Sequence, residues 1–494
     1  MDLSLLIQGF SVVLLNPVNF LFILIGVTSG IIVGALPGLT ATMGVALLVP
    51  FTFNLPPIQG LVMLLGIFSG GIYGGSISAI LIRTPGTPAA AATLLDGFPL
   101  SQQGKAGQAL WMATFASFVG GVIGALVMTF LSPQIARFGL RFGPPEFFSL
   151  AIFGLMMIIS ISGRSLLKGI ISALIGLLIT TIGLDPISGV ARFTFGNQNL
   201  LGGLEFIPVL VGLFGFAQVF RNIEKMKDEK HERSRIEHML PSVKDVTSNL
   251  FTMVKSGLIG TFVGSVPGCG CDIAAFIAYG EAKRSSKFPE RFGKGEIRGV
   301  AAAEAANNGA TGGAMIPMLT LGVPGDAVTA VLLGALTIHG YQPGPLLFRD
   351  HLDIVYPIFA GQIATQAVMV VVGLLGARLF ARLIDIDPKV LTPVIFFLCI
   401  VGSYSMRFSF FDVGLAIGIG IIAYFMEYYE YTVSPILLAL ILGPMAEQNF
   451  RRSLMMSEGD ATIFFTRPIA LAFIILTLVI GVSSYFRTRK VQEG

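Results

Sequence analysis

The chain has 494 residues, of which 54% are hydrophobic and only 12% are charged. Soluble domains carry roughly a quarter charged residues, so this composition excludes a soluble globular protein and indicates an integral membrane protein. The formal net charge of +4 gives no sign that nucleic acid is a partner.

Apolar segments follow one another along the chain, from Val18–Leu36 to Pro468–Phe486, and no charged residue or histidine occurs from Leu3 to Ile82. About 20 apolar residues make one helical span. Strand-length alternation is absent and glycines interrupt the apolar runs, which favours helices over a β-barrel. The sequence therefore predicts an all-α, polytopic, multi-pass membrane protein with roughly 12 spans plus short hairpin segments. The first apolar segment lacks a basic leader and a signal cleavage site, so we expect it to stay in place.

One long hydrophilic segment, Arg221–Asn249, divides the chain nearly in half. We expect four regions: a first transmembrane half (1–220), a charged cytoplasmic linker (221–249), a second transmembrane half (250–466), and a final span with a cytoplasmic tail (467–494).

The placement of Lys and Arg predicts the orientation. The linker, the basic loop Lys283–Arg298 and the tail with Arg487, Arg489 and Lys490 should all be cytoplasmic. The stretch Met253–Gly280 joins two of these cytoplasmic segments, so it must enter the membrane and return. Either a re-entrant hairpin that turns at Pro267-Gly268 or two full spans would satisfy this requirement.

The two halves share an ordered set of motifs. Gly34-x-x-Pro37-Gly38 matches Gly264-x-x-Pro267-Gly268, and Gly74-Gly75 before Pro85-Gly86 matches Gly312-Gly313 before Pro324-Gly325. The loop that corresponds to Lys283–Arg298 is the uncharged Thr52–Pro57, which should face outward. Equivalent loops on opposite sides predict two inverted repeats, as in many secondary transporters. Chance matching in a glycine-rich chain is the alternative.

Four Pro-Gly pairs interrupt apolar segments, and their prolines are the predicted structural breaks: Pro37, Pro85, Pro267 and Pro324. Proline removes an N–H and glycine permits unusual backbone angles. A broken helix exposes N–H groups that attract carboxylates and carbonyls that attract Na⁺. A kink that serves only packing is the alternative.

Polar residues of the second half are candidates for a cation site. Asp272 is the lone charged residue between Ser256 and Gly280, and Asn307 and Asn308 offer amide oxygens suited to a hard cation. Asp272 could instead form a salt bridge or begin a helix near the membrane face, and the asparagines could bond between helices. Glu304 could lie near the cytoplasmic face, because Arg298 is only six residues away.

The first half offers hydroxyl groups and one cation in the equivalent places. Arg83 ends the uncharged run and could pair with an anionic substrate or extend to the membrane interface. The complete set of expected substrate-binding residues is Gly38, Thr40, Thr42, Ser76, Arg83, Thr84, Gly86, Thr87, Gly268, Gly325 and Asp326.

Enzyme and metal motifs are not found in the sequence, which has no Walker sequence, no H-E-x-x-H and no G-x-S-x-G. Cys269-x-Cys271 is too short for a usual zinc pair and favours small-residue packing. We therefore expect no catalytic residue, no metal and no cofactor other than a coupling Na⁺ or H⁺. A channel or scaffold without coupled transport is the rival to a transporter.

The motifs closely resemble the large membrane subunit of the tripartite tricarboxylate transporter family. They include Gly264–Gly268, Phe276–Tyr279, Phe292–Gly295, Glu304–Asn308, Gly312–Pro317 and Leu36–Leu39. The resemblance implies an ion-driven symporter of the bacterial inner (cytoplasmic) membrane. Its partners would be a small membrane subunit, a periplasmic solute-binding protein that delivers a carboxylate, and the lipid bilayer. Cys269 and Cys271 stand where the family pattern has small non-thiol residues.

Overall fold

The computed structural model describes residues 2–161, 165–224, 243–384, 386, 388–405 and 407–493. The central part of the predicted linker, 225–242, lies outside the described residues, and so do the side chains of Arg487, Arg489 and Lys490. Helices occupy both described ends of the linker, because α10 (Ala217–Glu224) and α11 (Val243–Gly264) extend into it.

The described residues are almost entirely helical, which confirms the all-α polytopic class. Six helical stretches of the described residues are long and apolar enough to cross a membrane: α2 (Pro17–Ala35), α4 (Pro57–Ile82), α6 (Ala106–Gly139), α9 to α10 (Phe206–Glu224), α16 (Leu352–Leu383) and α18 (Phe410–Tyr428). Shorter apolar helical stretches of 10–17 described residues accompany them, in α3 (Ala41–Thr52), α7 (Pro144–Ile161), α8 (Leu166–Thr180), α14 (Ala327–Ile338), α17 (Pro388–Tyr404) and α21 (Pro468–Glu493). The expected number of roughly 12 spans stays a prediction.

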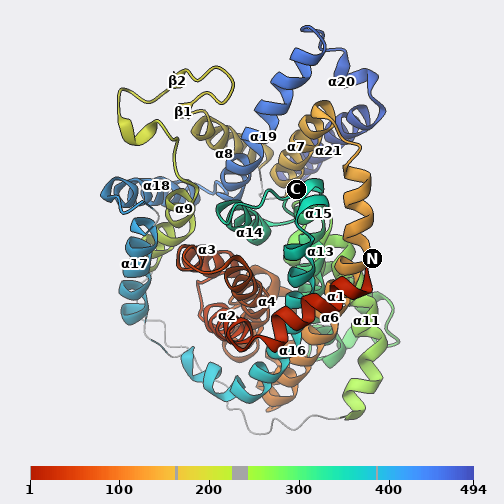
Figure 1. Cartoon of the computed structure of the whole chain (residues 1–494). Coiled ribbons are helices and arrows are strands. Elements are labelled where there is room, and N and C mark those ends of the chain that lie inside the picture. Colours follow the sequence, from red (N-terminus) through yellow and green to blue (C-terminus); the bar gives the residue numbers. More distant parts are fainter. Residues whose placement is uncertain are drawn as a thin grey trace.

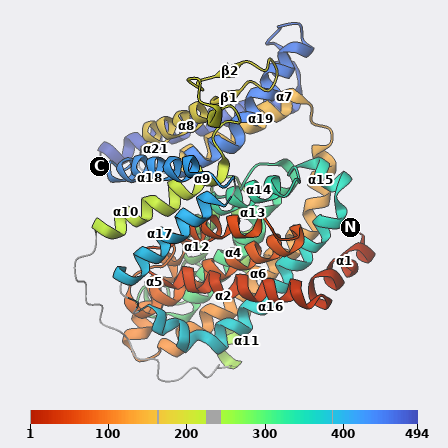
Figure 2. The same cartoon turned by 60° about the vertical axis from the view of Figure 1, so that its left-hand side comes forward.

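The helices form two groups, which Figures 1 and 2 show from two sides. In one group, α13 (Ile297–Leu321) packs against α6, α11 and α4, and α2 and α16 pack against α4. The other group holds α7, α8 and α21 against α19 (Ser434–Met456). Each predicted Pro-Gly pair separates two helices in the first group: α2 from α3, α4 from α5 (Ala91–Gln102), α11 from α12 (Gly270–Arg284), and α13 from α14.

The segment around Pro267-Gly268 forms an antiparallel hairpin of α11 and α12. Lys255 of α11 forms an ion pair with Glu281 of α12, with 2.5 Å between Nζ and Oε1. From this pair to the break, each arm is about 14–17 Å long at 1.5 Å per residue, which is about half of a hydrocarbon core of roughly 30 Å. The chain therefore turns back at the break, and the short arms agree with a re-entrant hairpin, which stays a prediction.

Backbone contacts at the breaks match between the two halves. A side chain at Gly34 would collide with the Gly71 carbonyl, and one at Gly264 would collide with the Ala310 carbonyl. In the same way, Gly86 lies against the Gly34 carbonyl and Gly325 lies against the Gly264 carbonyl. Only glycine permits such close approach of two backbones. In each half, therefore, the second Pro-Gly break packs against the end of the helix that precedes the first break.

Equivalent loops of the two halves lie at opposite ends of α4. Gly60, near the beginning of α4, contacts Thr52 and His339. At the other end of α4, Ile80 packs on Gly97, whose neighbour Asp96 binds the loop that contains Gly293. This is the arrangement that an inverted repeat requires, and the repeat itself stays a prediction.

Asp96 fastens the loop Lys283–Arg298 to the first half. Its buried carboxylate accepts hydrogen bonds from the backbone N–H groups of Gly293, Gly295 and Glu296 at 2.8–2.9 Å. The Tyr279 hydroxyl donates a fourth at 2.9 Å. One side chain of α5 therefore organises a loop that lies about two hundred residues later in the sequence.

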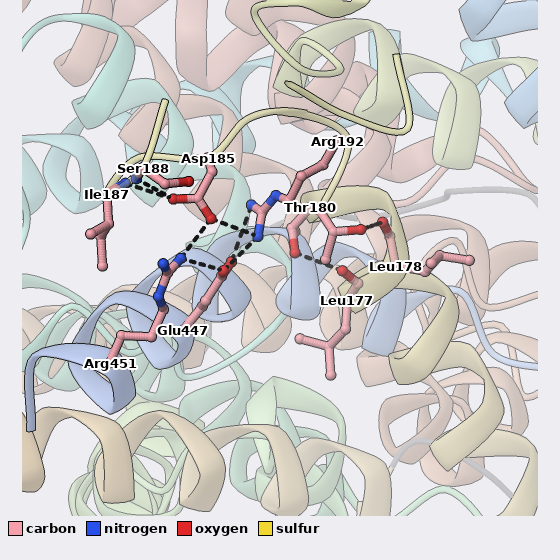
Figure 3. A network of polar contacts seen from close by, with 10 residues as sticks. Leu177, Leu178, Thr180, Asp185, Ile187, Ser188, Arg192, Glu447 and Arg451 are labelled. Atoms are coloured by element: carbon pink, nitrogen blue, oxygen red, sulfur yellow. Dashed lines mark hydrogen bonds and ion pairs between the residues drawn. The ribbon is translucent and has the colours of Figure 1, made fainter. Parts of the chain in front are cut away.

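A short antiparallel hairpin, β1 (Gly183–Leu184) with β2 (Ala191–Arg192), was not anticipated by the sequence analysis. Figure 3 shows how it is attached to α19. Asp185 accepts from the N–H groups of Ile187 and Ser188 and forms ion pairs with Arg451 at 2.6 Å and Arg192 at 3.4 Å. Arg192 also contacts Glu447 at 2.6 Å. The charges alternate, so each carboxylate has a guanidinium beside it.

Replacement of Asp96 by Ala should lower the free energy of unfolding by about 3 kcal/mol, because three backbone N–H groups and the Tyr279 hydroxyl lose their acceptor. Tyr279→Phe, which removes one donor only, should cost about 1 kcal/mol. Thermal unfolding in detergent measures both. Equal destabilisation by the two variants would contradict the role of Asp96.

Acid should loosen the β1–β2 hairpin. The backbone N–H of Ser188 and the Arg451 guanidinium hold the pKa of Asp185 below its ordinary value. The stabilisation is therefore present above the unfolded value near pH 4 and is lost as the pH falls further. The protection factors of residues 183–192 against hydrogen exchange, which correct for the pH dependence of the intrinsic rate, should be constant from about pH 5 upward and should fall below about pH 4.

The variant Asp185→Asn should remove this pH dependence, and Asp460→Asn, remote from the hairpin, should preserve it. An unchanged acid profile in Asp185→Asn would show that another group controls the hairpin.

Candidate functional site

A cavity of about 1210 Å³ lies where the broken helices meet. The beginnings of four helical segments line it: Thr40–Met43 of α3, Thr87 and Pro88 of the 3₁₀-helix η2 (Pro88–Ala90), Gly268–Ile273 of α12, and Asp326–Val328 of α14. Helix N-termini carry partial positive charge and unpaired N–H groups. Both halves of the chain therefore direct their helix beginnings at one cavity.

Local sequence explains how these helix beginnings are built. The extended Thr40 accepts a hydrogen bond from the Met43 N–H at 3.2 Å, and Asp326 forms a capping box with Thr329 at 2.7 Å. The beginning of α12 has no side-chain cap. Its N–H groups are the ones left available to a ligand.

The two breaks of the second half are joined directly. The Gly268 N–H donates to the Gly325 carbonyl at 2.7 Å. Gly268 and Gly270 have φ values of 87° and 59°, which favour glycine. The turn before α12 is therefore fixed by the turn before α14.

The opposite wall of the cavity comes from α10, α18 and the residues after α18. Arg221 donates to Gln218 at 3.1 Å and forms an ion pair with Glu427. Gln218 in turn lies against Gly38 of the first break. The lining continues to Glu224, the last residue of α10. The cavity thus extends from the breaks toward the side on which the linker begins.

Acidic side chains predominate in the cavity. The described lining contains five carboxylates, those of Glu224, Asp272, Asp326, Glu427 and Glu430, and the single guanidinium of Arg221. Arg221 pairs with Glu427, and Lys168 pairs with Glu430, which leaves three carboxylates without an ion-pair partner in the described lining. Carboxylates repel an anion, whereas helix N-termini attract it. The cavity therefore combines groups that attract an anion with groups that repel one.

Six of the predicted substrate and cation residues line the cavity: Thr40, Thr42, Thr87, Gly268, Asp272 and Asp326. Asp272 is exposed to the cavity from the first turn of α12. Gly38, Gly86 and Gly325 lie behind the lining and shape the breaks.

Arg83 and Thr84 lie outside the described lining. Arg83 is exposed, has a φ of 60°, and holds its guanidinium 5.8 Å from the centre of the Phe98 ring. The Thr84 hydroxyl is directed at the Ile82 carbonyl, 3.4 Å away. For Arg83 the surface position agrees with the alternative in which it extends to an interface.

Ser76, Asn307 and Asn308 are buried in the helix core. Ser76 donates to Glu304 at 3.1 Å. Asn308 donates to the Ser69 carbonyl at 3.5 Å, and the amide oxygen of Asn307 lacks a hydrogen-bond partner. The structure therefore does not bring Asn307 and Asn308 to the cavity beside Asp272, as a shared cation site would require. Glu304 is fully buried.

Sequence reasoning missed the wall formed by Gln218, Arg221 and Glu427. A signal was present for part of it, because Glu427–Tyr431 is a run of acidic and aromatic residues between two apolar segments. Nothing local indicates that this run faces the Pro-Gly breaks, since the contact depends on how the two helix groups are packed.

The cavity can be tested through the three native cysteines. Cys269 is half-buried and lines the cavity, whereas Cys399 is fully buried elsewhere. A small thiol reagent should therefore modify Cys269 first, and Cys269→Ser should abolish this early labelling, as measured by mass spectrometry. The matched variant Cys399→Ser should leave it intact. Early labelling that survives in Cys269→Ser would contradict an accessible cavity.

Comparison with known proteins gives one family and two relatives. The profile of the tripartite tricarboxylate transporter TctA family matches residues 20–438. An Agrobacterium vitis protein, described as an uncharacterized 52.8 kDa protein in the TAR-I ttuC' 3' region, is 37% identical over 479 residues, which cover 97% of this chain and 95% of that protein. A second A. vitis protein, from the TAR-II ttuC' 3' region, is 36% identical over 220 residues, covering 44% of this chain and 91% of that protein. No solved structure matches the chain.

Proposed function

The chain belongs to the tripartite tricarboxylate transporter TctA family, and from this premise we propose that it is the membrane subunit of an ion-gradient-driven symporter. The symporter imports a di- or tricarboxylate or a similar organic anion. Na⁺ or H⁺ supplies the driving force.

The meeting of four helix beginnings in one cavity is the observation that carries this proposal. Each contributes a partial positive charge, which is worth most where water is scarce. The uncapped beginning of α12 and the hydroxyl of Thr42 give a carboxylate its hydrogen-bond donors. Discontinuous helices around a central site are the usual way in which secondary transporters hold a substrate and an ion.

The excess of carboxylates in the cavity supports coupling to a cation. An organic anion that entered alone would meet unbalanced negative charge, whereas an anion that enters with cations would not. The electrostatics therefore make substrate binding depend on the ion. This dependence is what a symporter needs.

The partners and location follow from the same family. We propose that the chain acts in the bacterial inner membrane together with a small membrane subunit. A periplasmic solute-binding protein delivers the anion to the side opposite the linker.

Accumulation in proteoliposomes distinguishes this proposal from a channel or scaffold. The chain, reconstituted with its co-purified subunits and the binding protein, should concentrate a radiolabelled carboxylate against its gradient when a Na⁺ or H⁺ gradient is imposed. It should also show counterflow when the driving gradient is absent. Uptake that stops at equal concentrations and lacks counterflow would instead establish a channel.

Thr42→Val should weaken carboxylate binding without preventing transport. The substitution preserves the shape of the side chain and removes one hydroxyl from the cavity wall. We expect the half-saturation concentration to rise about fivefold, equivalent to about 1 kcal/mol, with a similar maximal rate. Thr84→Val is the matched control, because Thr84 does not line the cavity; equal effects of the two variants would contradict a substrate contact at Thr42.

A further inference from the structure

Glu304 lies inside the helix core with no cation beside it. Its side chain is fully buried, and no lysine, arginine or histidine of the described residues forms an ion pair with it. An ionised Glu304 would therefore have no counter-charge among the described residues, in an interior where an isolated charge is costly.

Three hydroxyl groups surround this carboxylate, each from a different helix. Ser76 of α4 and Ser117 of α6 contact Oε2 at 3.1 and 2.8 Å, and Thr93 of α5 contacts Oε1. All three side chains are fully buried. The two carboxylate oxygens of Glu304 and the three hydroxyl oxygens thus form one cluster between α4, α5, α6 and α13.

Asn307 adds a further group to this cluster. It lies one helical turn from Glu304 on the same side of α13, is fully buried, and interacts weakly with the Glu304 carboxylate. Its Oδ1 has no hydrogen-bond partner. A buried amide oxygen without a donor is costly unless something else occupies its lone pairs.

We propose that Glu304, Ser76, Thr93, Ser117 and Asn307 form the site of the coupling cation, and that this cation is Na⁺. The inference rests on the proposed function, and it moves the cation from the cavity to the core behind it. Oxygen atoms of carboxylate, hydroxyl and amide groups are the ligands of hard cations. A single carboxylate balances a single positive charge, so a monovalent ion suits the site and a divalent ion does not.

The unpartnered oxygen of Asn307 favours Na⁺ over a proton. A proton on Glu304 could be donated to Ser76, whose own hydroxyl hydrogen can go to the Tyr73 carbonyl, but it would leave the Asn307 oxygen without a partner. With Na⁺ bound, the hydroxyl groups turn their lone pairs to the ion, and the Asn307 oxygen gains a partner. One ion therefore supplies the contact that this buried oxygen lacks.

The site is linked to the substrate cavity through α4 and α5. Thr93 lies in α5, directly after η2, and η2 begins next to Thr87 in the cavity wall. Ser76 follows Gly75, which packs against Thr87. A cation held between Ser76 and Thr93 fixes these two helices against each other. It thereby fixes the beginning of η2 in the cavity wall, which is how ion and substrate binding are coupled.

Sodium-dependent thermal stability of the purified full chain tests the site without requiring transport. At constant ionic strength, replacing choline by Na⁺ should raise the unfolding temperature of the wild-type protein progressively with Na⁺ concentration. Glu304→Gln should abolish this shift, and Asp272→Asn, in the cavity, should keep it. A shift retained by Glu304→Gln, or lost in Asp272→Asn alone, overturns the proposal.

Milder substitutions keep the test valid if Glu304→Gln does not fold. Ser117→Ala and Thr93→Val should each raise the Na⁺ concentration at half-maximal shift roughly tenfold, because each removes one ligand. Ser101→Ala, a buried serine in the same α5 helix but outside the cluster, should not change it. Equal effects of all three overturn the proposal.

Transport assays distinguish a failure of this inference from a failure of the proposed function. If the wild-type chain concentrates a carboxylate with a pH gradient alone and shows no Na⁺ shift, the Na⁺ site is wrong and the symporter stands. If no gradient drives accumulation, the proposed function fails, whereas a Na⁺ shift lost in Glu304→Gln would still establish the site.

Discussion

Backbone contact at glycine is the constraint on which the rest of the structure depends. Gly86 rests on the Gly34 carbonyl and Gly325 rests on the Gly264 carbonyl, so the second break of each half is seated on the end of its first. Any side chain at these positions would push the two breaks apart. Because both pairs are this close, four helix beginnings come together, and the cavity exists where they do.

The breaks and the hairpin at Pro267-Gly268 could be predicted from the sequence because they have local causes. Proline and glycine mark Pro267-Gly268 and its three counterparts whatever the tertiary structure. The charge rule then required Met253–Gly280 to return to the side it came from. Helix number was harder to predict, since short helices beside a break and long helices that span share the same apolar composition.

The buried polar cluster could not be predicted in the same way. Glu304 contacts Ser76, Thr93 and Ser117, which precede it by about two hundred residues and occur on three different helices. Serine and threonine are common in membrane helices, and their spacing indicates no partner. The same holds for Asp96, whose carboxylate binds a loop of the other half. Such pairs become visible only when the packing of the helices is known.

The proposed cation site and the acidic cavity together give a physical account of how coupling would work. The carboxylates of the cavity oppose an anion until positive charge is nearby, and a cation would stabilise the buried Glu304. Both sites include residues of α4, and η2, whose beginning lines the cavity, is followed directly by α5. A cation in the core would therefore lower the electrostatic cost of an anion in the cavity, and by linkage the anion would strengthen cation binding equally. Coupling would then need no direct contact between the two ligands, only the helices that lie between them.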